Sequence, residues 1–182
     1  MKSKKNTFVS RAAVGCVTTA IFLLLCIIKG IYPFGTATLD TVDFQSQWIP
    51  AYYHVWDVLH GDGSAFFDWR VGGGNNFAGV SAQFSLLSPF NLFFLFVKRS
   101  WIEKSMIVFI IIKLLAMGYS MRWFLKEQVL GEERYGVYIL AGSVGYAVNG
   151  YTLLYYGMGW LDVAAILPLL CYFFCGMAER EG

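Results

Sequence analysis

The chain has 182 residues, of which 57% are hydrophobic and only 14% are charged. A soluble domain usually carries about 25% charged residues, so this composition excludes an ordinary soluble domain and predicts a protein surrounded by the lipid bilayer. The formal net charge of +2, with no basic run interleaved with aromatic residues, excludes a nucleic-acid partner.

The first element in the chain is an apolar run that follows a basic start. Lys2, Lys4, Lys5 and Arg11 precede the run Ala12–Ile28. We interpret residues 12–32 as a first transmembrane helix and residues 1–11 as a cytoplasmic N-terminus. A secretory signal peptide is the alternative, but no small-residue cleavage site follows the run.

Residues 33–104 have a different character and are expected to form one long external loop. Aromatic and apolar residues recur every three to four positions over Phe44–Leu59, which predicts an amphipathic helix lying on the membrane surface. Phe84–Val97 is apolar but short, and Pro89 interrupts it. It is therefore expected to be re-entrant or interfacial.

Residues 105–178 are expected to hold three further transmembrane helices, over Ser105–Leu125, Gly136–Tyr151 and Val163–Ala178. Residues 179–182 then form a cytoplasmic end. The predicted fold class is all-α, a polytopic transmembrane helical bundle of about four spans with amphipathic and re-entrant segments in its first loop.

Two topologies fit this pattern, and they differ in whether Phe84–Val97 crosses the membrane. If it does not cross, four spans leave Arg70, Lys98, Arg99 and Lys104 outside. If it crosses, five spans leave Arg70, Arg122, Lys126, Arg134 and Arg180 outside. The positive-inside rule favours the four-span topology, which leaves fewer basic residues outside. Only in that topology do Asp43 and Asp162 lie on the same side.

Three charged residues allow both a structural and a functional interpretation. Lys113 lies near the middle of a predicted span, where an unpaired charge costs roughly 2.5–3.5 kcal/mol. It therefore snorkels to the interface, forms an ion pair or contacts a lipid phosphate. Asp162 either caps the last helix or acts as a second acid facing Asp43. Arg70 either pairs with Asp68 or contacts a phosphate or sugar.

Five short motifs, in this order, resemble the opening of the YfhO family of bacterial membrane proteins. They are Thr41-Val42-Asp43 followed by Gln45 and Gln47, Gly61-Asp62-Gly63-Ser64, Gly72-Gly73-Gly74-Asn75, Leu87-Ser88-Pro89-Phe90-Asn91-Leu92 and Trp160-Leu161-Asp162. The resemblance covers about Gly30 to Ala178. The family is several times longer, so the resemblance implies that the chain corresponds to its N-terminal part.

The resemblance implies a membrane glycosyltransferase of the GT-C type in the bacterial cell membrane. Such enzymes move a sugar from a polyprenyl-phosphate carrier to a cell-envelope acceptor, here a polymer such as a teichoic acid. The catalytic acid of this fold lies in the first external loop, where Asp43 matches best and Asp40 is the close rival. Gln47, Asn75 and Trp160, which belong to the motifs, are expected to contact substrate.

A carboxylate is the group this chemistry needs, because the acceptor hydroxyl loses a proton as it attacks the anomeric carbon. A positioned base contributes about 10²–10⁴-fold. Asp43 and Asp162 together would also suit Mg²⁺ or Mn²⁺. Two alternative functional hypotheses remain. The protein could be a membrane component that binds or transports lipid or polymer without chemistry, or an inactive truncated fragment.

Overall fold

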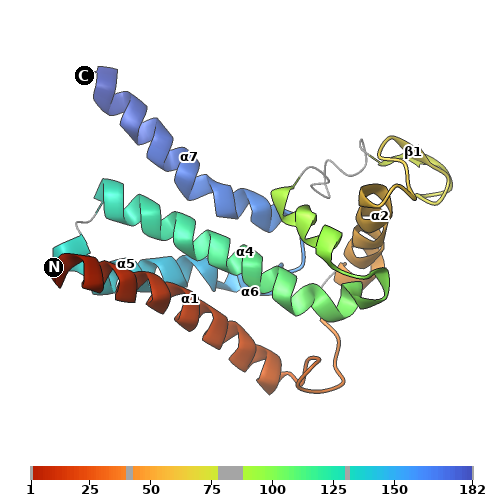
Figure 1. The fold of residues 1–182 in the computed structure, drawn as a ribbon, viewed down its shortest axis with the longest axis horizontal. Helices are drawn as coiled ribbons and strands as arrows, with labels where there is room; N and C mark the ends of the chain where they lie inside the picture. Colours follow the sequence, from red (N-terminus) through yellow and green to blue (C-terminus); the bar gives the residue numbers. More distant parts are fainter. Residues whose placement is uncertain (1, 40–42, 78–87, 130–131, 182) are drawn as a thin grey trace.

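The computed structural model of the protein describes residues 2–39, 43–77, 88–129 and 132–181. The chain is an all-α helical bundle with a polar loop region gathered at one end, as Figure 1 shows. Among the described residues, three helical segments are long and apolar enough to cross a membrane: Arg11–Ile28, Gly136–Leu154 and Trp160–Ala178. The predicted fold class of an all-α polytopic helical bundle is therefore confirmed.

The helix α1 spans Lys2–Ile28 and contains the first of these segments. Its end is set by Gly30, whose φ of +61° lies in the left-handed region that glycine adopts without strain. The amide of Ile31 donates to the carbonyl of Cys26, and the amide of Gly30 donates to that of Ile27. This pair of hydrogen bonds is a Schellman motif, which satisfies the last carbonyls of the helix.

The central element is α4, Ile102–Phe124, which packs against α1, α5 (Glu132–Ala147) and α7 (Trp160–Glu181). Its 23 residues correspond to about 35 Å, enough to cross a bilayer. Gly118 brings α4 close to α1, since a Cβ there would lie 3.2 Å from the Val14 side chain. Small residues at such contacts are typical of helices packed in membranes.

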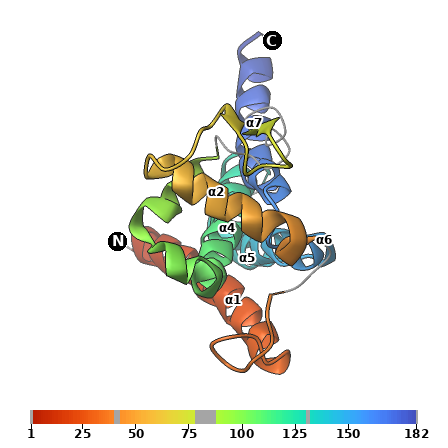
Figure 2. The same cartoon turned by 90° about the vertical axis from the view of Figure 1, so that its right-hand side faces the viewer.

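A π-helical turn η1 (Phe44–Trp48) and α2 (Ile49–Leu59) lie across the end of this bundle, as Figure 2 shows. We expected their apolar face to lie on the membrane surface, but the structure buries it against protein. Tyr52 packs on Phe94 and Phe109, with ring centroids 5.3 Å apart in both contacts. The aromatic face of α2 therefore seals one end of the core.

The rest of the loop consists of short elements. The strands β1 (Phe67–Asp68) and β2 (Asn75–Asn76) pair antiparallel, with Asp68 opposite Asn75. Three glycines with positive φ, at positions 72, 73 and 74, make the turn between them. The 3₁₀ helix η2 spans Pro89–Phe96 and η3 spans Arg99–Trp101.

The short η2 bears on the choice between four and five spans. Its 8 residues rise about 16 Å, roughly half of the hydrocarbon thickness. It packs against α2 and α4 at the loop end of the bundle. Residues 84–87 of the predicted re-entrant segment lie outside the described residues. The described part of Phe84–Val97 is thus a short 3₁₀ segment at the loop end, and the four-span topology stays a prediction.

The second half of the bundle holds the other predicted spans. The third predicted helix is divided into α5 and a short α6, Gly150–Leu154, whose first turn is capped by the Asn149 side chain. α7 begins at Trp160, three residues before the predicted start. Residues 155–159 connect α6 to α7 and meet η1, because the rings of Phe44 and Tyr156 make an edge contact at 6.1 Å. Two segments far apart in sequence therefore meet at the loop end.

Candidate functional site

A cavity lies in the polar loop region, between η1, α2, the β1–β2 hairpin and η3. It is an open cleft of about 940 Å³. Its polar lining residues are Gln45, Gln47, Tyr53, His54, Asp57, Arg70, Asn75, Arg99 and Glu103. Ile49, Val71 and Phe77 contribute apolar wall. The cleft therefore combines amide, acidic, basic and apolar groups at one end of an apolar bundle.

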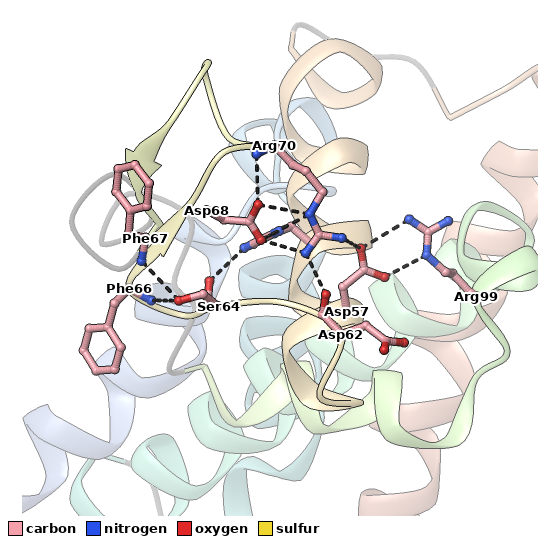
Figure 3. A network of polar contacts seen from close by, with 9 residues as sticks. Asp57, Asp62, Ser64, Phe66, Phe67, Asp68, Arg70 and Arg99 are labelled. Carbon is pink, nitrogen blue, oxygen red and sulfur yellow. Dashed lines mark hydrogen bonds and ion pairs between the residues drawn. The ribbon is translucent and has the colours of Figure 1, made fainter.

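A network of ion pairs forms one side of the cleft (Figure 3). Asp57, on α2, is buried and accepts hydrogen bonds from Arg99 at 2.7 Å and 3.3 Å. Arg70 adds a third contact to the same carboxylate at 3.4 Å. Hydrogen bonding to Asp57 raises the pKa of Arg99, so this guanidinium stays charged. Asp57 thus joins the hairpin to η3.

Arg70 also secures the hairpin through Asp68. Its Nε and Nη2 donate to Asp68 at 3.0 Å and 2.7 Å, and its Nη2 donates to the Asp62 carbonyl at 2.7 Å. These hydrogen bonds from Arg70 hold the pKa of Asp68 well below its usual value. On the other side of the Asp68 carboxylate, His54 Nδ1 lies 3.9 Å away. The sequence left two alternatives for Arg70, an ion pair with Asp68 or a contact to a phosphate or sugar. The structure shows the ion pair.

A second charged pair lies deep in the bundle. Lys113 Nζ, on α4, lies 2.8 Å from Asp162 Oδ1 in the first turn of α7, and both side chains are buried. Lys113 also lies over the ring of Phe109, 4.6 Å from its centroid. Within the described part of the chain, neither oxygen of Asp162 accepts a well-directed hydrogen bond. Lys113 is the partner that balances this buried charge.

Tyr52 lies next to this pair on the loop side. Its hydroxyl donates to the carbonyl of Gly157 at 2.7 Å. Burial raises the pKa of Tyr52 well above its usual value, and the negative charge of Asp162 adds to the shift. Tyr52 is therefore a neutral hydrogen-bond donor that ties α2 to the α6–α7 connection.

Asp43 lies at the start of η1, with its side chain exposed. Its backbone carbonyl accepts from the amides of Gln47 and Trp48. Its side chain does not cap η1, and the Asp43 carboxylate makes no hydrogen bond to any of the described residues. Its close rival, Asp40, lies outside the described residues. Asp43 is thus a carboxylate available to solvent at the loop end.

The predicted site residues divide into three groups. Gln47, Arg70 and Asn75 line the cleft. Lys113 and Asp162 form the buried pair, and Trp160 packs edge-on against Trp48, with ring centroids 6.2 Å apart. Asp43 stands apart from both groups, although η1 connects it directly to Gln45 and Gln47. Sequence reasoning missed Asp57, Arg99 and Glu103, because their roles depend on pairing across the loop.

The predicted metal pair of Asp43 and Asp162 does not fit this arrangement. Asp162 is buried and balanced by Lys113, whereas Asp43 is exposed. Nowhere in the described ranges do three or more histidines, cysteines or acids come together as a metal-ligand set.

Comparison with known proteins gives the family. The model of the family described as bacterial membrane protein YfhO matches residues 15–173. The chain belongs to the YfhO family. The matched residues include the candidate site residues of this YfhO protein described above, from Asp43 to Asp162. A search of curated proteins and a search of solved structures each gave no match.

Proposed function

We propose that this YfhO-family protein is the module of a GT-C-type membrane glycosyltransferase that holds the catalytic base. The reaction moves a sugar from a polyprenyl-phosphate carrier to a hydroxyl group of a cell-envelope polymer such as a teichoic acid. The observation that carries the proposal is the exposed Asp43 carboxylate, two residues from a polar cleft at the end of an apolar bundle. A lipid-linked donor and a polar acceptor meet at such a boundary.

In this mechanism Asp43 accepts the proton of the acceptor hydroxyl. The hydroxyl oxygen forms the new bond to the anomeric carbon, and the bond from that carbon to the carrier phosphate breaks. The phosphate leaves with the bonding electrons, so a cation near it favours the transition state. Lys113 is the cation that the sequence predicts for this role. Because Asp162 holds its charge at 2.8 Å, a phosphate would have to displace that carboxylate.

One observation favours a second function, a membrane component that binds or transports lipid or polymer without chemistry. Asp162 is held by Lys113 and cannot serve as a free partner acid for Asp43. A protein that only binds or transports lipid or polymer needs no base at position 43. Substitution of Asp43 therefore distinguishes the two proposed functions.

The test is sugar transfer in membranes that contain the protein, with a labelled polyprenyl-phosphate sugar as donor. We expect Asp43→Asn to lower transfer by about 10²–10⁴-fold without lowering the amount of protein in the membrane. Asp62→Asn is the matched control, since Asp62 is also an exposed loop aspartate and accepts Arg70 through its backbone. Transfer by Asp43→Asn at the level of the control would remove Asp43 from the mechanism.

A further inference from the structure

The cleft presents three side-chain amides whose N–H groups make no hydrogen bond to the described residues. Gln45 and Gln47, on η1, make no side-chain hydrogen bond within the described parts of the chain. Asn75, on β2, uses only its Oδ1, which accepts from the amide of Asn76 at 2.8 Å. Each free amide carries two N–H donors, and those of the glutamines add a carbonyl acceptor. A hydroxyl group also both donates and accepts, so it is the ligand group that these amides match.

The charged groups of the cleft are balanced among themselves. Arg70 and Arg99 are both bonded to Asp57, and Arg70 is further held by Asp68. Glu103 accepts a hydrogen bond from the Tyr53 hydroxyl at 3.2 Å, and Arg99 covers the Tyr53 ring at 4.9 Å. A bound anion would have to compete with carboxylates that already hold the guanidinium groups. The cleft is therefore poorly suited to a phosphate and well suited to a neutral ligand.

The size and walls of the cleft agree with a ligand at the large end of the small-molecule range. Its 940 Å³ lies near the upper end of the about 300–1,000 Å³ that small-molecule sites span. Ile49 and Val71 supply apolar surface beside the amides. Such a combination of apolar wall and amide groups fits the C–H faces and hydroxyl edges of sugar rings.

We propose that this cleft binds a neutral, hydroxyl-rich saccharide or polyol through the amides of Gln45, Gln47 and Asn75. The identification of this ligand with the acceptor rests on the function proposed above, whereas the binding itself does not. The neutral hydroxyl-rich units of the polymer would occupy the cleft, and their phosphates, where present, would lie outside it. The ligand would then contact Gln45, which is two residues from Asp43 in the sequence.

The experiment is direct binding to the purified full chain in detergent, with no sugar donor present. The probes are maltotriose as the neutral ligand and inorganic phosphate as the anion, each at low and high salt. Maltotriose is followed by saturation-transfer NMR, and phosphate, which has no carbon-bound protons, is followed by broadening of its ³¹P NMR signal. We expect saturable binding of maltotriose that salt changes little, and no comparable binding of phosphate. Absence of saturable maltotriose binding, or binding of phosphate in its place, would overturn the inference.

Variants assign the binding to the cleft. We expect Gln45→Ala with Gln47→Ala to weaken maltotriose binding by about tenfold, as the loss of two neutral hydrogen bonds predicts. Asn75→Ala, in the exposed hairpin, is an independent test of maltotriose binding in case the η1 variant does not fold. Gln128→Ala, in the helical segment η4 (Leu125–Val129) that follows α4, is the matched control. Unchanged binding in both cleft variants contradicts the inference.

The two proposals can fail separately. If maltotriose binds through the amides but no sugar is transferred, saccharide binding in the cleft is confirmed and the glycosyltransferase activity is not. If transfer depends on Asp43 but neither cleft variant changes the KM for the acceptor, the glycosyltransferase stands and the cleft assignment fails.

Discussion

Lys113 and Asp162 lie 49 positions apart in the sequence, and in the folded protein the Nζ of one is 2.8 Å from the Oδ1 of the other. The pair joins the middle of α4 to the first turn of α7. A buried charge is costly alone and is tolerated when its partner is close. The position of α7 against α4 is therefore coupled to the charge of Lys113.

The first prediction concerns this pair. Lys113→Met should destabilise the protein by about 3–5 kcal/mol, because it leaves the Asp162 carboxylate buried without a partner. Adding Asp162→Asn to Lys113→Met should restore much of that stability, because no buried charge then remains. Thermal unfolding in detergent, followed by circular dichroism, measures both variants.

The control for the Lys113 variants is Lys126→Met, which removes a lysine paired with Glu127 at a more exposed position. Exposed ion pairs contribute about 0–1 kcal/mol, so this variant should unfold at nearly the unaltered temperature. A double variant no more stable than Lys113→Met alone would show that the pair does not carry the effect.

The second prediction concerns Asp57, the acceptor shared by Arg70 and Arg99. Asp57→Asn should loosen the hairpin and η3 and cost about 1–2 kcal/mol, since water replaces only part of the lost bonding at the half-exposed arginines. Limited trypsin digestion should then cleave faster after both arginines. Asp62→Asn keeps the backbone carbonyl that Arg70 uses and should be cleaved at the unaltered rate. Equal rates for the two variants would contradict the network.

The third prediction is a pH dependence of the hairpin. Hydrogen bonds from Arg70 lower the pKa of Asp68 below its usual 3.8. A carboxyl whose pKa is lower in the folded state stabilises it above the unfolded pKa, and this contribution is lost as the pH falls below about 4. Hydrogen exchange of the amides of residues 66–77 should therefore become faster, after correction for intrinsic rates, below that pH. Asp68→Asn should abolish this dependence, and persistence of the dependence in Asp68→Asn would assign it elsewhere.

The fourth prediction tests the contact between η1 and the α6–α7 connection. A Cβ on Gly157 would overlap the ring of Phe44, so Gly157→Ala must displace Phe44 and the neighbouring Asp43. Overpacking of this kind costs about 1–3 kcal/mol. Thermal unfolding should show the loss, and transfer activity should fall with it. Gly145→Ala, on α5, has open space around its Cβ and should leave both unchanged.

The long apolar helices could be predicted because each carries its own signal in a continuous run of residues. The predicted starts of α4 and α7 lie three residues from the observed ones, as expected where a boundary depends on turn residues rather than on hydropathy. The apolar face of Phe44–Leu59 was also visible, but its burial partner was not. Phe94 and Phe109, which cover Tyr52, come from segments whose positions depend on the fold.

The candidate site was predictable only in part, for the same reason. The motifs pointed to Gln47, Arg70 and Asn75, which do line one cleft. Asp57 and Arg99 are 42 positions apart, and nothing in the sequence indicates that they pair. The unusual position of Lys113 within an apolar helix made an ion pair one of its possible environments. Several acids were available as the partner, and the fold selects Asp162.

The measurement that tests the central claim most directly is thiol accessibility in intact cells. After removal of the four native cysteines, single cysteines at Ser46, Tyr151 and Glu127 are labelled with an impermeant reagent. All three positions are exposed, and the first two lie at the loop end beside the cleft and the α6–α7 connection. We predict that 46 and 151 label from outside, while 127 labels only after permeabilisation. Labelling of 127 in intact cells with protection of 46 would place Asp43 on the cytoplasmic side and contradict the account.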